Sequence, residues 1–304
     1  METKRGMASV DLTAGRIAPD NPGPLRRLLR SPLIRGLKYR TLGARPFRRL
    51  FTRNFTSGMV ALGERNAYAF PMRWITVDWS EADFSLWLSK NTNLPFRDNS
   101  QRMVYSAHMV EHVEDDTLEW LLREVNRVLI PGGGVRIEAP DADKLIAVWH
   151  SRDRAALDYF RAGRKEMLCR HPELGEKYLE DHLTVLGEIS NYIDYTKGAL
   201  HIPVYADRET FERELSRGLE SFNLWAQRLK TPEQKKTGGH ANALTAAKLM
   251  AMLKAAGFTR VSLAEYGRTD IPGLRLGRGW RRLYDSVPET EARAFYSLYI
   301  EAFK

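Results

Sequence analysis

The sequence predicts an α/β fold with a mostly parallel sheet, and three observations lead to this prediction. Short apolar runs recur at residues 59–63, 74–79, 102–108 and 135–140. Between the last two runs, residues 114–130 carry apolar side chains at helical spacing. Strands that alternate with helices pair in parallel through right-handed crossovers. The chain of 304 residues is long enough for one large domain with an insertion, or for two small domains.

The helix expected over residues 114–130 has clear signals at both ends. Its first turn holds Glu114, Asp115 and Asp116, which suit the positive end of a helix dipole. Residues 131–134 read Pro-Gly-Gly-Gly and are expected to form a reverse turn before the strand at 135–140. This glycine run lacks the Lys and Ser/Thr of a phosphate-binding loop.

Changes in pattern divide the chain into four parts. Residues 1–53 form a basic N-terminal arm, and residues 54–150 hold the strands of the core. Residues 151–237 show no strand rhythm and are expected to be a helical insertion that caps the substrate. Residues 238–304 return to the core, with a helix at 242–256, a strand at 258–266 and a last strand at 295–304. Gly257 is a good residue to end that helix.

The positive charge of the chain is concentrated in the arm. Residues 1–53 hold 13 Lys or Arg and 3 Asp or Glu, whereas the remaining 251 residues hold 34 and 35. Residues 24–53 either form a basic amphipathic segment in peripheral contact with a membrane or polyanion, or a helix packed across the domain. A mitochondrial transit peptide is a further interpretation. Because the rest of the chain is nearly neutral, nucleic acid is not the expected partner.

Composition also bears on the cellular compartment in which the protein is expected. No apolar run approaches the roughly 20 residues that span a bilayer, and the N-terminus has no secretory h-region. Cys169 is the single cysteine, so no internal disulfide can form. These features favour a cytoplasmic protein.

Several motifs in the predicted core occur together and in order. The stretches are WITVDW at 74–79, NLPFRDNSQRMVYSAHMVEHV at 93–113 and LLREVNRVLIPGGGVRIEAPD at 121–141. The late helix, HANALTAAKLMAMLKAAGF at 240–258, also fits the pattern. In these motifs the chain resembles the S-adenosylmethionine (SAM)-dependent methyltransferases of the Methyltransferase type 11 group. The resemblance covers roughly residues 58–150 and 238–304.

The resemblance implies a fold, a cofactor and binding residues. The fold is a Rossmann-like class I methyltransferase sheet with an antiparallel last strand, and the cofactor is SAM. Such a ligand sits beyond the carboxyl ends of the strands, where Asp78 can accept both ribose hydroxyls. Asn93 and Leu94 would flank the adenine, or Asn93 would only shape its loop. Ser106 would face the methionine part.

The loop after the first strand departs from the family pattern. Family members carry glycines at alternate positions there, so that the backbone approaches the ligand closely. This chain keeps Gly63, but Arg65 stands where a second glycine is expected. Arg65 either points outward, or pairs with the SAM carboxylate, or closes the pocket to SAM.

Catalytic candidates come from the strand edge, the insertion and the late helix. His108 is either the general base that takes a proton from the acceptor or a local packing residue. Tyr192 and His240 are the further candidates. The insertion offers other side chains that could contact an acceptor: His182, Asn191, Tyr195, His201, Tyr205 and Arg208.

Residues 108–112 also match an H-x-x-E-H zinc pattern. A zinc site of that kind needs both histidines on one helix face and a distant third ligand. His108 falls at a strand end, so the sequence favours local hydrogen bonding for Glu111 and His112 and predicts no metal.

The expected function is methyl transfer from SAM to an oxygen or nitrogen of a small molecule, such as a sugar, a glycan precursor or a secondary metabolite. One alternative is other SAM chemistry, either aminocarboxypropyl transfer or a cyclisation. Another is an inactive methyltransferase-like scaffold whose basic arm binds a partner or membrane. Arg65 favours the scaffold, whereas Asp78 and the Leu94-Pro95-Phe96 loop favour methyl transfer.

Overall fold

A computed structural model describes most of the chain from residue 58 onward. The described residues are 58–63, 74–79, 82–170, 172–190, 193–194, 200–201, 205–231, 235, 239–274 and 295–304. The basic arm, Arg65 and Tyr192 lie outside them. Among the described helices, none is both long and apolar enough to cross a membrane.

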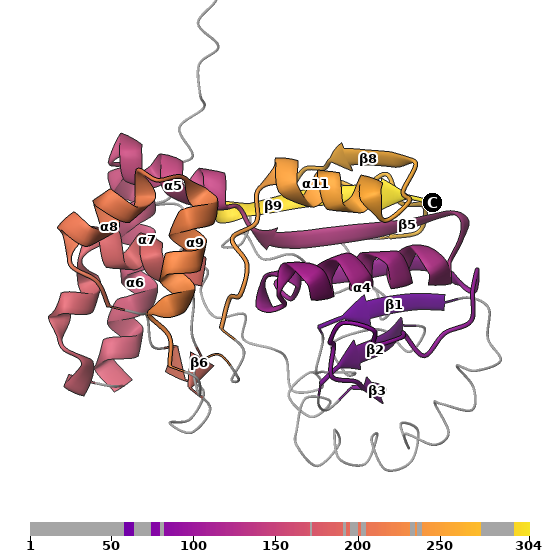
Figure 1. Cartoon of the computed structure of the whole chain (residues 1–304), viewed down its shortest axis with the longest axis horizontal. Coiled ribbons are helices and arrows are strands. Elements are labelled where there is room, and N and C mark those ends of the chain that lie inside the picture. The colour runs from indigo at the N-terminus through magenta and orange to yellow at the C-terminus, as the bar shows by residue number, and fades with distance from the viewer. Residues whose placement is uncertain are drawn as a thin grey trace, which may run out of the picture. The chain divides into compact units, whose positions relative to one another are not determined.

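The core is a seven-stranded sheet with the order β3-β2-β1-β4-β5-β9-β8 (Figure 1). Its strands are β1 (Gly58–Leu62), β2 (Trp74–Asp78), β3 (Phe84–Ser85), β4 (Gln101–Ala107), β5 (Leu129–Pro140), β8 (Arg260–Leu263) and β9 (Ser297–Phe303). The first five pair in parallel. β9 runs antiparallel to both β5 and β8. This confirms the predicted mostly parallel sheet with an antiparallel last strand.

The strands are apolar on both faces because each face is covered. On one face, Val60, Leu62 and Val104 pack with apolar side chains of α4 (Asp115–Val128) and α11 (Ala246–Ala255). Figure 1 shows both helices running along the sheet. On the other face, Met59 and Ala61 join a separate apolar cluster. A period of two along each strand separates the two sets.

The ends of α11 follow from local chemistry. Thr245 caps its start, since the hydroxyl accepts a hydrogen bond from the backbone N–H of Lys248 at 3.1 Å. Gly257 follows its end with φ +96°, and Phe258 donates its N–H to the carbonyl of Leu253. This Schellman arrangement confirms the predicted stop and turns the chain toward β8.

The glycine run at 131–134 differs from its prediction. It lies inside β5 rather than in a reverse turn, and the pairing of β5 with β4 shifts register there. Gly132 donates its N–H to the carbonyl of Lys304, and the carbonyl of Gly133 accepts from the N–H of Lys304. These bonds to the end of β9 hold the glycines in the sheet.

The insertion is helical, as predicted, and forms a core of its own. It contains α6 (Arg154–Arg170), α7 (Asp181–Ser190), α8 (Arg208–Leu215) and α9 (Leu219–Arg228), with two 3-10 turns (Pro172–Leu174 and Glu176–Leu179) and a short hairpin of β6 (Ile193–Asp194) and β7 (Leu200–His201). α5 (Ala142–Ser151) packs into the same apolar cluster through Leu145, Val148 and Trp149. We call α5 to α9 the helical cap (Figure 1). The predicted boundary at residue 150 thus falls near the end of its first helix.

Candidate functional site

The carboxyl ends of β1, β2 and β4 bring the predicted cofactor residues together. Leu62 pairs with Val77 on one side and with Ser106 on the other. Gly63 then donates its N–H to the carbonyl of Val77 at 2.9 Å. The ends of parallel strands at a switch in strand order form a crevice for nucleotide-like ligands. Gly63, Asp78 and Ser106 therefore share one edge.

Gly63 occupies a position that only glycine fits well. Its φ is +80°, and a Cβ at this residue would lie 2.3 Å from the Cβ of Met109. The left-handed backbone turns the chain sharply at the end of β1. At residue 63 the sequence therefore supplies the glycine that this backbone conformation favours.

Two polar side chains at this edge are buried. Asp78 is the last residue of β2 and is almost fully buried. Its backbone carbonyl accepts a hydrogen bond from the N–H of Leu86. Ser106 is 1% exposed, and its hydroxyl has no hydrogen-bond partner within the described part of the chain. A buried hydroxyl without a partner is costly unless a ligand completes it. The residues of this edge thus fit a polar cofactor such as SAM.

The Asn93–Leu94 loop is held against α4. The N–H of Leu94 donates to Glu124 Oε2 at 2.8 Å, and its carbonyl accepts from Arg127 Nη2 at 3.2 Å. The Leu94 side chain lies in the core cluster beside Val77, whereas Asn93 is exposed. Contact of either residue with adenine stays a prediction.

His108 lies directly after β4 in a left-handed turn, with φ +49°. Its Nε2 is 2.9 Å from Ser297 Oγ and 3.4 Å from Glu138 Oε1. Its Nδ1 is 3.4 Å from Glu111 Oε1. A partly exposed imidazole between two buried carboxylates is thus fixed in orientation on both sides.

Glu111 is the centre of a cluster of imidazoles. It belongs to the 3-10 turn Val110–His112 and is 1% exposed. Besides His108, His112 Nε2 lies 3.9 Å and His240 Nε2 lies 3.8 Å from its Oε1. Burial raises the pKa of Glu111, but the polar contact with His108 and the charges of His112, His108 and His240 lower it to about 2. Glu111 is therefore ionised at neutral pH.

His240 also belongs to this cluster, although it follows Glu111 by 129 positions in the chain. The segment around His240 is hydrogen-bonded to the 3-10 turn that holds Glu111. The N–H groups of Ala241 and Asn242 both donate to the carbonyl of Glu111, at 2.7 and 3.0 Å. Burial lowers the pKa of His240 to about 3, with further lowering from the charge of His112. A group with this pKa is a weak base at neutral pH, and a catalytic role for His240 stays a prediction.

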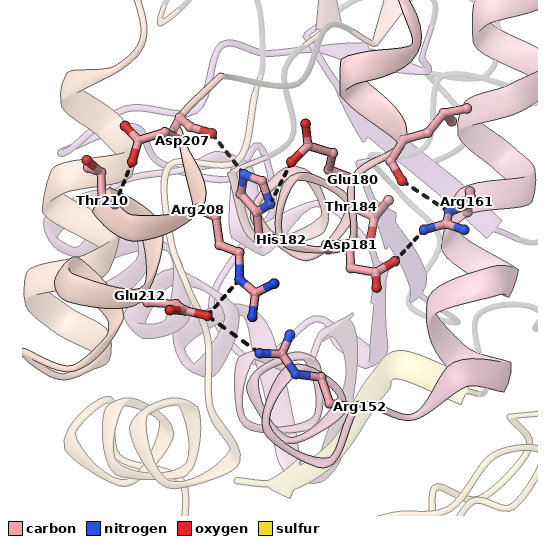
Figure 2. Close-up of polar contacts among 12 residues, drawn as sticks. Arg152, Arg161, Glu180, Asp181, His182, Thr184, Asp207, Arg208, Thr210 and Glu212 are labelled. Carbon is pink, nitrogen blue, oxygen red and sulfur yellow. Dashed lines mark hydrogen bonds and ion pairs between the residues drawn. The ribbon is translucent and has the colours of Figure 1, made fainter.

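The polar side chains of the helical cap form a separate network (Figure 2). His182 is buried between Trp149 and Phe211, and its Nε2 lies 2.9 Å from the carbonyl of Ala206. Arg208 pairs with Glu212 on the surface. These contacts hold the cap helices together, which gives His182 and Arg208 a structural role. Tyr192 lies outside the described residues, so its part in catalysis stays a prediction.

Sequence reasoning missed three groups that contact the site. Glu138 comes from the middle of the predicted fourth strand, and Ser297 from the last strand. Glu188 comes from the insertion, and its backbone carbonyl lies 3.0 Å from His240 Nδ1. No local motif marks them, although a carboxylate inside an apolar strand, as at Glu138, is a signal in itself.

A comparison with sequence models of protein families finds a match. Residues 39–137 match the sequence model of a family described as methyltransferase domain. A comparison with curated protein sequences finds no match.

Solved structures similar to the chain include three SAM-dependent methyltransferases. That from Thermotoga maritima has 14% identity over 88% of this chain and 99% of its own, with a TM-score of 0.36. That from Mesorhizobium loti has 15% identity over 86% and 99%, with a TM-score of 0.35. That from Archaeoglobus fulgidus has 12% identity over 89% and 99%, with a TM-score of 0.33.

The family match covers β1, β2 and β4 and most of β5, the strands whose ends carry Gly63, Asp78 and Ser106. The mostly parallel sheet with an antiparallel β9 is the fold that the resemblance to class I methyltransferases implies. Residues 39–137, which include β1 to β4, α4 and most of β5, therefore match the methyltransferase domain family.

Proposed function

We propose that the chain transfers the methyl group of SAM to an oxygen or nitrogen of a small molecule, with His108 as the general base. A sugar, a glycan precursor or a secondary metabolite is the acceptor class. The observation that carries the proposal is the position of His108 at the end of β4, between the carboxylates of Glu111 and Glu138. The near-neutral charge of residues 54–304 supports a small acceptor over nucleic acid.

The cofactor side is formed by the edge described above. SAM supplies an electrophilic methyl group, so the protein needs to align the acceptor and remove its proton. In the proposal the Asp78 carboxylate accepts hydrogen bonds from the ribose hydroxyls, and the Ser106 hydroxyl forms a hydrogen bond with the ligand. The turn at Gly63 lets the ligand approach the backbone closely. Asn93, Leu94 and Arg65 contribute the rest of the pocket.

The contacts of His108 support a defined proton path. With the Glu111 carboxylate beside Nδ1, the neutral imidazole keeps its proton on Nδ1. Its Nε2 is then an acceptor, which the hydroxyl of Ser297 meets at 2.9 Å. When Nε2 takes the acceptor's proton, the imidazolium lies 3.4 Å from both carboxylates, which stabilise its charge.

The cofactor site is tested by calorimetry with SAM and S-adenosylhomocysteine. The full chain is expected to bind both, and Asp78→Ala is expected to lose binding by roughly 100-fold because the buried carboxylate holds two hydroxyls. Asp116→Ala, on the exposed surface of α4, is the matched control and should bind as the parent does. Equal affinity in Asp78→Ala would remove Asp78 from the site.

The chemistry is tested by turnover with methyl-labelled SAM and a panel of sugars, phenols and amines. Methyl transfer yields S-adenosylhomocysteine, whereas aminocarboxypropyl transfer yields methylthioadenosine, and mass spectrometry separates the two. His108→Gln should keep its affinity for SAM and lose about 10²–10⁴-fold in kcat. His150→Gln, an exposed residue of α5, should change neither quantity. A fall in SAM affinity alone would argue against the base role.

A further inference from the structure

The cluster around Glu111 leaves buried polar atoms without partners. Neither oxygen of the Glu111 carboxylate has a hydrogen-bond partner of good geometry among the described residues, although the side chain is 1% exposed. Nδ1 of His112 is likewise buried and without a partner there. The rings of His112 and His240 lie edge to face, with centroids 4.8 Å apart. Buried polar atoms without partners are costly unless a bound ion or ligand completes them.

The hydrogen bond of His240 fixes where its lone pair points. A backbone carbonyl can only accept, so Nδ1 of His240 donates its proton to the carbonyl of Glu188 at 3.0 Å. In the neutral ring, Nε2 then carries a lone pair, and it faces Glu111 Oε1 at 3.8 Å. Two electron-rich atoms that face each other across this gap have no proton to share. A cation between them would satisfy both.

We propose that Glu111, His112 and His240 bind one divalent transition-metal ion, of which zinc is the first candidate. One ligand atom from each residue lies within 4.8 Å of the others. Two imidazoles and one carboxylate form a ligand set that zinc accepts, with its fourth position left for water or a further ligand. Only Glu111 and His112 of the H-x-x-E-H match take part, and His240 supplies the ligand that is distant in sequence.

The distances require a modest contraction. Bonds of about 2.0–2.1 Å in a tetrahedron place the ligand atoms about 3.3 Å apart. The two imidazole nitrogens now lie 3.8 and 3.9 Å from Glu111 Oε1. The three ligand atoms lie within 4.8 Å of one another, so side-chain rotations that bring the two imidazole nitrogens closer by up to about 1.5 Å close the site. The groups behind the ligands are in place, since a carbonyl already orients His240 in the manner typical of metal-binding histidines.

The ion would join parts of the chain that are distant in sequence. Glu111 and His112 follow β4, whereas His240 precedes α11 and contacts α7 through Glu188. The segment around His240 is already bonded to Glu111 through backbone N–H groups. A bound ion therefore cross-links the end of β4, the start of the C-terminal part of the core and the helical cap.

The test measures zinc on the untagged full chain in a Cys169→Ser background, which removes the exposed thiol as a competing ligand. The protein is stripped with a chelator, dialysed and titrated with Zn²⁺, with Mg²⁺ as the hard-cation comparison. About one zinc per chain should remain after desalting, and the Tm should rise on addition of Zn²⁺ and not of Mg²⁺.

Variants assign the ligands. His112→Gln and His240→Gln should each weaken zinc binding by roughly 100-fold or more, because each removes a direct ligand. His150→Gln and His182→Gln change an exposed and a buried histidine of the cap and should bind zinc as the parent does. If His240→Gln does not fold, the His112→Gln variant tests the proposal, because His112 is partly exposed and its replacement disturbs the core less. The proposal would be overturned if the desalted parent retained no more zinc than magnesium. It would also be overturned if His112→Gln bound zinc as tightly as the parent.

Discussion

At the scale of single residues, Gly63 and Gly132 share a left-handed backbone but differ in what surrounds them. Gly63 has φ +80° and Gly132 has φ +74°. A Cβ on Gly63 would meet Met109 at 2.3 Å, whereas a Cβ on Gly132 would meet nothing within 4 Å. The pair separates the cost of backbone strain from that of steric contact.

Gly63→Ala is expected to lower SAM affinity by at least about tenfold and to destabilise the fold by roughly 2–4 kcal/mol, because the turn must shift away from Met109. Gly132→Ala should cost only about 1 kcal/mol of strain and leave SAM binding unchanged. Calorimetry and urea unfolding measure the two quantities. Similar effects in both variants would mean that strain alone matters at Gly63.

Residue-scale features were predictable from sequence where chain position alone determines them. Asp78, Ser106 and His108 follow from strand ends, since parallel strands finish at one edge. The meeting of His240 with Glu111 was not predictable, because it depends on how a segment 129 positions away folds back. The contact of His108 with Ser297 spans 189 positions and has the same cause.

At the scale of elements, β5 and β9 are joined by a buried ion pair as well as by their ladder. Arg136 pairs across the strands with Glu301, and their side chains meet at 2.8 Å in full burial. Arg136 also donates to the carbonyls of Glu265 and Arg268. The guanidinium thus connects the sheet to the chain that follows β8.

Arg136→Met is expected to destabilise the fold by about 3–5 kcal/mol, because it leaves the Glu301 charge buried without its partner. The double variant Arg136→Met with Glu301→Leu should be less destabilised than the sum of the two single variants. Denaturant unfolding of all four proteins gives the coupling free energy. Strict additivity would show that the two charges act independently.

The start of α8 gives a pH-dependent contribution to stability. The backbone N–H of Thr210 donates to Asp207, and this bond lowers the pKa of that carboxyl below its usual value (Figure 2). A lowered pKa means that the folded state favours the charged form. The contribution is therefore present above the unfolded pKa of 3.8 and is lost as pH falls through the lowered value.

Asp207→Asn keeps an oxygen at the cap but removes its charge. The parent should be more stable than this variant near pH 6, and the difference should shrink as the pH falls below 3.8. Urea unfolding of both proteins across this range measures the difference. A gap that stays constant with pH would show that the charge contributes nothing.

Elements with a strong period were predictable and those without one were not. All eight strands and helices predicted by range correspond to strands or helices at nearly the same residues, from β1 to β9. β3 has only two residues, too few to show a period. The glycine run at 131–134 was predicted as a turn because its bonds to Lys304 are not visible in local sequence. α5 was assigned to the core because its partners lie up to about 100 positions later.

At the scale of the whole molecule, charge and fold are divided between different parts of the chain. The sheet and helical cap carry 34 Lys or Arg against 35 Asp or Glu over residues 54–304, whereas residues 1–53 hold the excess of positive charge. Affinity for polyanions should therefore depend on the arm and not on the methyltransferase core.

A full-length variant with Arg26, Arg27, Arg30, Arg48 and Arg49 changed to Gln should elute from a heparin column at lower salt than the parent, because fewer ionic contacts hold it. Its affinity for SAM should be unchanged. A matched variant with five exposed arginines of residues 54–304 changed to Gln is the control and should shift less. Equal elution of the two variants would place the polyanion contact outside the arm.

The place of β9 also has a consequence for how the protein is made. The five parallel strands are complete once residue 140 has left the ribosome, and β8 follows at 260–263. β5 and β8 have no contact in the ladder until β9, at 297–303, enters between them. During synthesis the buried strand β5 therefore has an open edge until β9 is made. A chain that ends before residue 297 is therefore expected to expose this strand edge and to aggregate more readily than the full chain.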